Sequence, residues 1–381
     1  MHFKRQSALL DAVEALLIGK RLSLTYLGRN LQSKTKEKNC IRKIDRLLGN
    51  KKLHSEIGFC YESHCKIILS KISRPLISVD WAATDKRKDW HILRASVNIK
   101  GRGFVLYQEV HPHKKLNSRQ VQHRFLEKIK IMLPENCTPI IVADAGFRFP
   151  WFSKIKELGF DFVGRVRNKT SYKKLNKDSW YSNCLDLYKK ATSVPKHLGK
   201  MFFAKKIDLE CEVVIYKKPT KHRKNINRSG RPTDNTVSHR CARSERDPWL
   251  LVTSLDVSAI GAQKIISFYA KRMQIEEDFR DLKSHKFGFG LRYAMSKSQN
   301  RIAVLLLIAA LASLICWLIS LDAKENKIHL DFQSNTIKHR DVLSVIYLAC
   351  QLIRKGYLFN LKRLKDAFLI FLNQAMEAVS C

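Results

Sequence analysis

The sequence predicts a mixed α/β protein with helical regions at both of its ends. Two apolar runs that each finish on an aspartate, Leu76–Asp80 and Pro139–Asp144, are typical of buried strands. His91–Ile99 and Phe104–Val110 resemble the two arms of a β-hairpin, because they alternate and flank Lys100–Gly103. Helical spacings lie between and around these strands, so the order of the elements favours a sheet covered by helices.

Composition narrows the class of protein. The chain has 381 residues with 71 Lys and Arg against 34 Asp and Glu, a formal net charge of +37. Apolar residues make up 45%, which is enough for buried cores and excludes a disordered basic tail. A foldable chain with this charge is expected to bind a polyanion, and DNA, RNA and an anionic membrane surface are the candidates. Ten cysteines without a CxxC pair indicate reduced thiols in a cytosolic protein.

Residues 1–73 predict a helical domain. Leu9–Leu17 and Tyr26–Leu31 show helical spacing, and Ile41–Leu48 forms a third amphipathic segment that stops at Gly49. The polar face of this third segment carries Arg42, Lys43 and Arg46. A short helix, a turn and a basic helix are typical of a DNA-reading domain. A small bundle with a solvated basic face gives the same pattern.

Residues 74–300 predict the α/β core. Helices are expected over Gln120–Met132 and Trp151–Leu158, followed by a strand at Phe160–Arg167. From about 168 to 250 the alternation of strands and helices gives way to short strands and a basic loop at 217–246, which indicates a β-rich insertion. Ala262–Lys283 predicts one long helix.

Residues 301–381 predict a helical C-terminal region. Ile302–Leu321 is twenty residues long and carries no charge, so its length alone makes it a candidate membrane span. It is the only such segment, and the chain on both sides of it is polar and basic. We therefore expect a helix buried in a soluble core, and recovery of the protein without detergent tests this.

Two carboxylates occupy equivalent places in the predicted sheet. Asp80 and Asp144 each end an apolar strand, where sheet proteins place ligands. Hard cations such as Mg²⁺ prefer oxygen ligands, and Glu276 is the best candidate for a third acid. Three carboxylates that hold two metal ions would support in-line displacement at phosphorus.

The helix that carries Glu276 offers further polar groups. Tyr269, Arg272, Glu276 and Lys283 follow one another at offsets of 0, 3, 7 and 14, so all four share one helix face. Tyr, Arg and Lys suit phosphate oxygens. A solvated ladder of salt bridges is the commoner use of such a face.

These motifs together resemble the insertion-sequence-four family of bacterial DDE transposases, and in particular its cut-and-paste branch that includes the tetracycline-resistance composite transposon. The stretches that carry the resemblance are LTYLGRNL, KIDRLLGN, VDWAA, LRASV, ADAGFRFPW and YAKRMQIEEDFRDLKS, with the Y-x2-R-x3-E-x6-K spacing as the most specific. The resemblance implies a ribonuclease-H-like catalytic core over 74–300 with the insertion at about 168–250. It also implies a DNA-binding domain over 1–73 and a C-terminal region, 301–381, used in dimerisation.

The same resemblance implies the roles of individual residues. Asp80, Asp144 and Glu276 would be the catalytic triad and would hold two Mg²⁺ ions, for which Mn²⁺ could substitute. Tyr269, Arg272 and Lys283 would bind phosphates near the cleaved end, and Arg165 and Arg167 would contact DNA. Trp249 would stack on a flipped base, while a core position beside a strand is the alternative for this side chain.

The expected partners are the terminal inverted repeats of the element and target DNA, bound by a homodimer in the bacterial cytoplasm at the nucleoid, with no membrane association. Each end would be hydrolysed, closed into a hairpin, reopened and joined through its 3′-end to the target. A catalytically idle DNA-binding inhibitor and a structure-specific nuclease of the same core fold are the alternatives. A membrane protein built on 302–321 is a third.

Overall fold

The computed structural model describes residues 1–85, 87, 89–167, 170–219, 232, 235–236, 239, 247–334, 336–337 and 340–380. Its contacts divide the chain into two compact units, one made of Met1–Cys137 with Met273–Cys381 and the other of Thr138–Arg272. Most of the predicted basic loop 217–246 lies outside the described residues. The domain boundaries at 73, 74, 300 and 301 stay a prediction.

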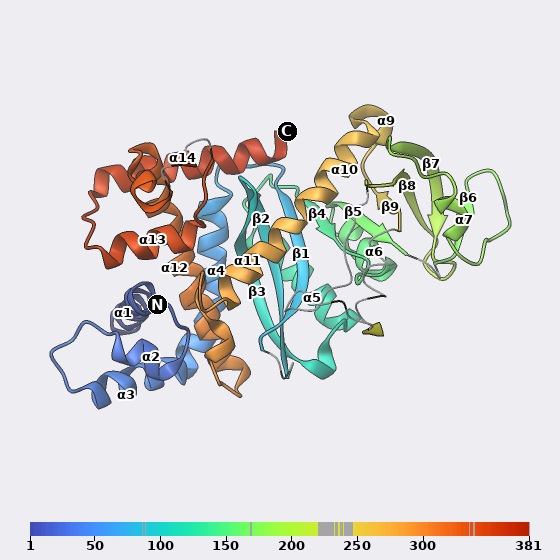
Figure 1. The fold of residues 1–381 in the computed structure, drawn as a ribbon. Helices are drawn as coiled ribbons and strands as arrows, with labels where there is room; N and C mark the ends of the chain where they lie inside the picture. The colour runs from blue at the N-terminus through green and yellow to red at the C-terminus, as the bar shows by residue number, and fades with distance from the viewer. Residues whose placement is uncertain are drawn as a thin grey trace. The chain divides into compact units, whose positions relative to one another are not determined.

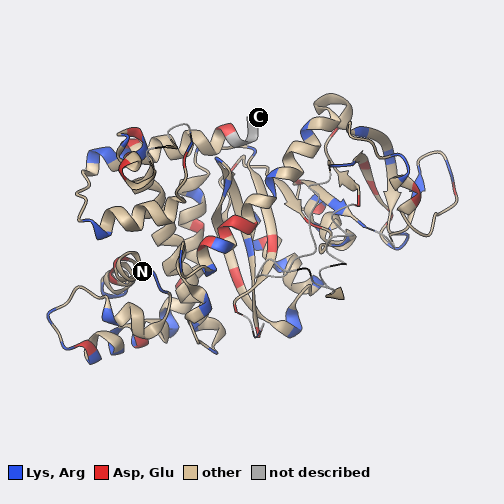
Figure 2. Cartoon of the chain, in the orientation of Figure 1, with Lys and Arg blue, Asp and Glu red and all other residues tan. Residues whose placement is uncertain are grey.

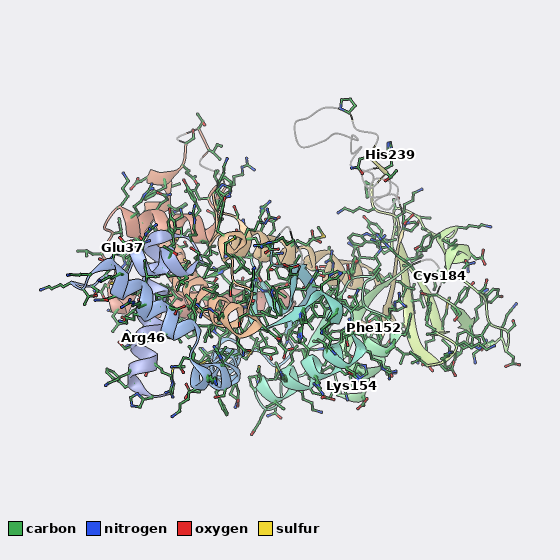
Figure 3. All side chains as sticks on the ribbon, turned by 90° about the horizontal axis from the view of Figure 1, so that it is seen from below. Glu37, Arg46, Phe152, Lys154, Cys184 and His239 are labelled. Carbon is green, nitrogen blue, oxygen red and sulfur yellow. The ribbon has the colours of Figure 1, made fainter. Side chains whose placement is uncertain are left out.

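The first unit begins with four helices: α1 (Phe3–Gly19), α2 (Leu24–Arg29), α3 (Glu37–Leu48) and α4 (Lys51–Ile68). Helix α3 buries Ile44, Leu47 and Leu48, and its C-cap is Gly49, as the spacing predicts. Arg42, Lys43 and Arg46 are exposed on its other face, where Figure 3 labels Arg46.

Three antiparallel strands form the sheet of the first unit, in the order β3-β2-β1. They are β1 (Leu76–Ala83), β2 (Trp90–Ile99) and β3 (Arg102–Pro112), and the hairpin expected between β2 and β3 is present. Asp80 pairs with Arg94 on β2, which pairs with Gln108 on β3. Because directly opposed residues lie on one face, these three side chains share a face of the sheet.

Helices from the C-terminal part of the chain pack against this sheet (Figure 1). Helix α11 (Met273–Lys283) packs on all three strands, and α12 (Gln299–Glu325) packs on β3, α4, α13 (Val345–Arg354) and α14 (Leu361–Ser380). Helix α5 (Arg119–Met132) packs on α4. The remaining short turns are η1 (His113–Lys115), η2 (Leu291–Tyr293) and η3 (Ile328–Phe332).

Helix α12 contains the apolar segment 302–321. In the described part of the chain it is the one helix that is long and apolar enough to cross a membrane. Most of its side chains are buried against neighbouring elements of the same unit, including Leu305, Ile308 and Cys316. A helix that is apolar all round and covered by protein belongs to a core, so the packing agrees with the expected buried helix.

The second unit is built on six strands in the order β4-β5-β9-β8-β7-β6. The first two, β4 (Ile140–Ala143) and β5 (Asp161–Val166), are parallel and joined through α6 (Phe149–Glu157). The other pairs are antiparallel. The remaining elements are β6 (Tyr172–Lys174), α7 (Leu185–Tyr188), β7 (Lys196–Phe203), β8 (Leu209–Tyr216), β9 (Trp249–Thr253), α9 (Val257–Ile260) and α10 (Ala262–Lys271).

The predicted mixed α/β class with helical ends is confirmed, and strands β6 to β8 lie in the stretch expected as an insertion. The single helix predicted over 262–283 is wrong, because Arg272 separates α10 from α11. The backbone of Arg272 stays helical, with φ −52° and ψ −33°, but its N–H bonds to the carbonyl of Tyr269, three residues back. The helix therefore narrows to a single 3₁₀-type turn at this residue.

Candidate active site

Asp80 lies inside β1 and not at its end. The apolar run stops at Asp80, yet Trp81, Ala82 and Ala83 continue the pairing with β2. The carboxylate Oδ1 accepts a hydrogen bond from the backbone N–H of Trp81 at 2.7 Å. Asp80 is half-buried, so part of its side chain remains open to a ligand.

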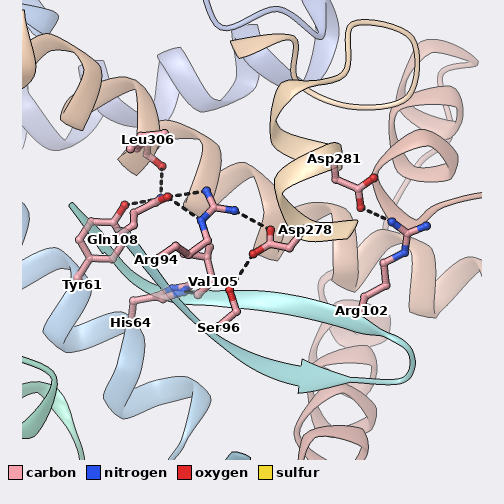
Figure 4. A network of polar contacts seen from close by, with 10 residues as sticks. All are labelled: Tyr61, His64, Arg94, Ser96, Arg102, Val105, Gln108, Asp278, Asp281 and Leu306. Carbon is pink, nitrogen blue, oxygen red and sulfur yellow. Dashed lines mark hydrogen bonds and ion pairs between the residues drawn. The ribbon is translucent and has the colours of Figure 1, made fainter. Parts of the chain in front are cut away.

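Helix α11 is attached to the hairpin by its acidic side chains (Figure 4). Arg94 Nη1 lies 2.8 Å from Asp278 Oδ1, and the Ser96 hydroxyl donates to Asp278 Oδ2 at 2.8 Å. Arg102 Nη1 contacts Asp281 Oδ2 at 2.7 Å. Burial raises the pKa of the Asp281 carboxyl to about 6, although Arg102 lowers it. These contacts fix which side of α11 faces the sheet.

Glu276 and Lys283 lie on another side of α11. They are seven residues apart, or nearly two whole turns, so they share a face, and Glu276 is exposed. Burial lowers the pKa of the Lys283 ammonium to about 8, with Arg94 and Arg292 adding repulsion and Asp80 opposing it. The charge of Asp80 acts on Lys283, and α11 packs on β1, so the Lys283 end of this face lies near the Asp80 strand.

Asp144 belongs to the second unit and follows the last residue of β4. Its Oδ1 accepts a hydrogen bond from the N–H of Gly146 at 2.8 Å. A side chain at Gly146 would meet this oxygen at 2.9 Å, so the glycine leaves room for the carboxylate. The expectation that Asp144 ends a buried strand is confirmed.

Tyr269 is the centre of a polar and aromatic cluster in the second unit. Trp249 packs edge-on against its ring at 4.8 Å, and Arg165 hydrogen-bonds to its hydroxyl. Burial raises the pKa of Tyr269, Arg272 and Arg165 lower it, and the charge of Asp144 raises it again. The unit therefore gathers Asp144, Tyr269, Arg165 and Arg272 around one point, and half-buried Trp249 borders it.

Arg165 and Arg167 occupy different positions around β5. Arg165 is nearly buried on the strand, and its guanidinium donates to the backbone carbonyls of Asp247 and Pro248 at 3.2 and 3.3 Å. Arg167 follows the strand and is half-buried. Both line a cavity of about 550 Å³, together with Phe147, Arg148 and Phe149.

The remaining predicted DNA contacts lie on α3, near the start of the chain. Lys43 Nζ is paired with Asp11 on α1 at 2.5 Å, so this lysine joins two helices. Arg42 and Arg46 point to solvent. Of the three, these two arginines are the better candidates for phosphate contacts.

The predicted metal ligands are divided between the units. Asp80 and Glu276 belong to the first and Asp144 to the second. Among the described residues, no group of three or more His, Cys, Asp or Glu side chains is close enough to hold a metal ion. The donor chemistry nevertheless suits Mg²⁺, because all three side chains offer carboxylate oxygens.

Sequence reasoning missed Arg94, Asp278, Arg102 and Asp281. The available signal was Arg94 itself, a charge in the middle of the apolar strand His91–Ile99, which needs a buried partner. The acid-rich helix α11 could have supplied that partner, and Figure 2 shows the acidic residues gathered on it.

Carboxylates on or directly after strands, together with a cluster of Arg, Tyr and Trp, suit metal-dependent chemistry on phosphodiesters. A comparison with protein-family models agrees: residues 71–315, well over half of the chain, match the Transposase DDE domain. The chain therefore belongs to the DDE transposase family, whose fold is ribonuclease-H-like. No curated protein matches the chain.

Proposed function

We propose that this protein is a cut-and-paste DNA transposase of the insertion-sequence-four type. Its support is the first unit, where α11 carries Glu276 and Lys283 on one face and packs on the strand of Asp80. The family match supplies the reaction class, a transposase that acts on DNA. The motif spacing supplies the branch, and the net charge of +37 supports a polyanionic substrate.

In this proposal Asp80, Asp144 and Glu276 would hold two Mg²⁺ ions, for which Mn²⁺ could substitute. Bound metal would activate the attacking hydroxyl and stabilise the leaving oxygen. Lys283, Tyr269 and Arg272 orient the phosphate through charge and hydrogen bonds. The first strand is hydrolysed, the freed 3′-hydroxyl attacks the opposite strand to form a hairpin, and water reopens it. The 3′-ends then attack the target.

The other regions would supply DNA affinity and assembly. Arg42, Arg46 and the basic residues of 1–73 bind the terminal inverted repeats, Arg165 and Arg167 contact DNA beside Asp144, and 301–381 supports a homodimer. The protein would act in the cytoplasm at the nucleoid. The burial of α12 favours this over a membrane location.

The deciding experiment is incubation of the purified protein with its flanking element ends and Mg²⁺. Hairpin and strand-transfer products are expected. Asp80→Asn, Asp144→Asn and Glu276→Gln should each abolish cleavage and retain end binding. A variant that still cuts at the wild-type rate would show that its residue has no part in catalysis.

The two rivals give different products. A gel shift without cleavage in Mg²⁺ or Mn²⁺ would identify a catalytically idle inhibitor. Cleavage without joining to target DNA would identify a structure-specific nuclease.

A further inference from the structure

The side of α11 that faces away from Glu276 is fixed by one buried guanidinium. Arg94 is 2% exposed, lies opposite Asp80 on β2, and forms an ion pair with Asp278, which is 13% exposed. Asp278 is two residues from Glu276, about 200° around the helix. A contact at Asp278 therefore sets the rotation and the distance at which α11 presents Glu276 to the strand of Asp80.

The orientation of Arg94 is itself determined by three other elements. Its Nε donates to Gln108 Oε1 on β3 at 2.9 Å. The amide nitrogen of Gln108 donates to the Tyr61 hydroxyl on α4 at 2.8 Å and to the Leu306 carbonyl on α12 at 3.2 Å. The ring of Phe279 lies 4.9 Å from the guanidinium. Arg94 has little freedom to move, so Asp278 has little freedom either.

We propose that Arg94 is a positioning residue that holds helix α11 through Asp278, and thereby sets Glu276 against Asp80 for metal binding. This inference rests on the proposed function of Glu276 and Asp80. Arg94 touches neither substrate nor metal.

The chemistry of the contact supports positioning over stability. A buried ion pair contributes little to stability relative to well-packed apolar side chains, because desolvation offsets the attraction. The planar guanidinium of arginine, in contrast, contacts Asp278 and Gln108 at the same time, which the ammonium of a lysine cannot do in the same geometry. Arg102 makes a second attachment at Asp281, but its side chain is 23% exposed, so we expect it to be the weaker of the two.

The close approach of the helix adds to this constraint. A Cβ at Gly103 would lie 3.1 Å from the Gln274 carbonyl and 3.3 Å from Asp278 Cβ. Helix α11 thus rests on the backbone of β3, where no side chain intervenes. Contact at Gly103 sets the height of the helix, and the ion pair sets its rotation.

The test uses Arg94→Lys in the full-length protein, which keeps the charge and removes the fork. Amide hydrogen exchange over 273–283, read by mass spectrometry without DNA or metal, should become at least tenfold faster. The Mn²⁺ concentration at half-saturation, measured by electron paramagnetic resonance with bound element ends, should rise about tenfold, the usual scale for losing a group that orients metal ligands. End binding should stay at the wild-type level.

The matched control is Arg363→Lys. Arg363 forms a two-point ion pair with buried Asp322, at 2.7 and 2.9 Å, and joins α14 to α12. The same chemical change there should leave exchange in 273–283 and the Mn²⁺ midpoint at wild-type values. The compensating pair Arg94→Lys with Asp278→Glu, in which a longer acid meets a shorter cation, should recover both quantities at least in part.

Wild-type exchange and a wild-type Mn²⁺ midpoint in folded Arg94→Lys would overturn the proposal, as would equal changes in the Arg363→Lys control. If Arg94→Lys loses its cooperative unfolding transition, Asp278→Asn replaces it, because asparagine keeps the shape and one acceptor oxygen. Failure of the proposed function appears separately, as a wild type that does not cut DNA in Mg²⁺. The exchange measurement still tests the attachment of α11 in that case.

Discussion

Replacing Trp249 by alanine separates the two roles open to this side chain. Trp249 contacts Tyr269 edge-on at 4.8 Å and Tyr216 at 6.0 Å, and the Lys218 ammonium lies 5.4 Å from its ring. The indole is half-buried, so part of it remains open to a ligand. Stacking of an extruded base on such a ring contributes about 1–3 kcal/mol. Its loss should slow hairpin formation by about 5- to 150-fold.

The assay follows pre-nicked and intact element ends on denaturing gels, so that nicking and hairpin formation give separate rates. Trp249→Ala should nick at nearly the wild-type rate and form hairpins slowly, and Trp249→Phe should recover part of the second step. An edge-on aromatic pair contributes about 0.5–1.5 kcal/mol to folding. If the contact with Tyr269 were its whole role, both steps would fall together. An equal loss of both rates would refute the stacking role.

Further substitutions test, in turn, the packing, the charges and the DNA contacts. Gly164→Ala should destabilise the protein by about 1–3 kcal/mol, because its Cβ would lie 2.1 Å from the Phe152 ring. In urea unfolding, the added change Phe152→Leu should recover part of the lost stability. An unfolding midpoint of Gly164→Ala equal to that of the wild type would contradict this prediction. Glu109 is buried, which raises its pKa, but hydrogen bonds from His111, Lys128 and Tyr107 lower it to about 2 from 4.5. The ionised group thus stabilises the fold above pH 4.5 and loses this effect as pH falls toward 2, so Glu109→Gln should cost roughly 3 kcal/mol at pH 7 and little near pH 2 in denaturant titrations. Equal costs at both pH values would show that the charge is not responsible. Arg42→Ala and Arg46→Ala should each lower the salt slope of DNA binding by about one, and a slope equal to that of the wild type would remove that arginine from the interface.

The hairpin and the buried strands could be predicted because their signals are local. Apolar runs, alternation and the Lys100–Gly103 turn locate β1, β2, β3 and β4 within a few residues. Strand β7 could not be found in this way. Its sequence Lys196–Phe203 is mostly exposed or half-buried, and the pairing with β8 shifts between His197 and Gly199, where φ is +82°. A bulge breaks the two-residue period on which the prediction depends.

The sequence could nominate the residues of the candidate site, but it could not predict how they are arranged in space. Asp80, Asp144 and Glu276 each stand in a recognisable local sequence context. Arg94 and its partner Asp278, in contrast, are 184 positions apart, and only tertiary packing brings these two side chains together. The interruption at Arg272 carries no signal either. No Gly or Pro lies between Tyr269 and Lys283, and the backbone angles stay helical, so the break consists of one hydrogen bond made three residues back.

In the proposed site, helix α11 would keep one acid, Glu276, available as a ligand in a chain where Lys and Arg outnumber acids 71 to 34. Its four acids are Glu276, Glu277, Asp278 and Asp281. In a protein with a net charge of +37, carboxylates readily find cations, and three of the four contact Arg94 or Arg102. Glu276 points elsewhere because the helix turns by about 100° for each residue. In the proposed mechanism, the arginines that hold the helix would therefore also set which carboxylate faces the Asp80 strand, so a change in the rotation of α11 would affect catalysis as well as packing.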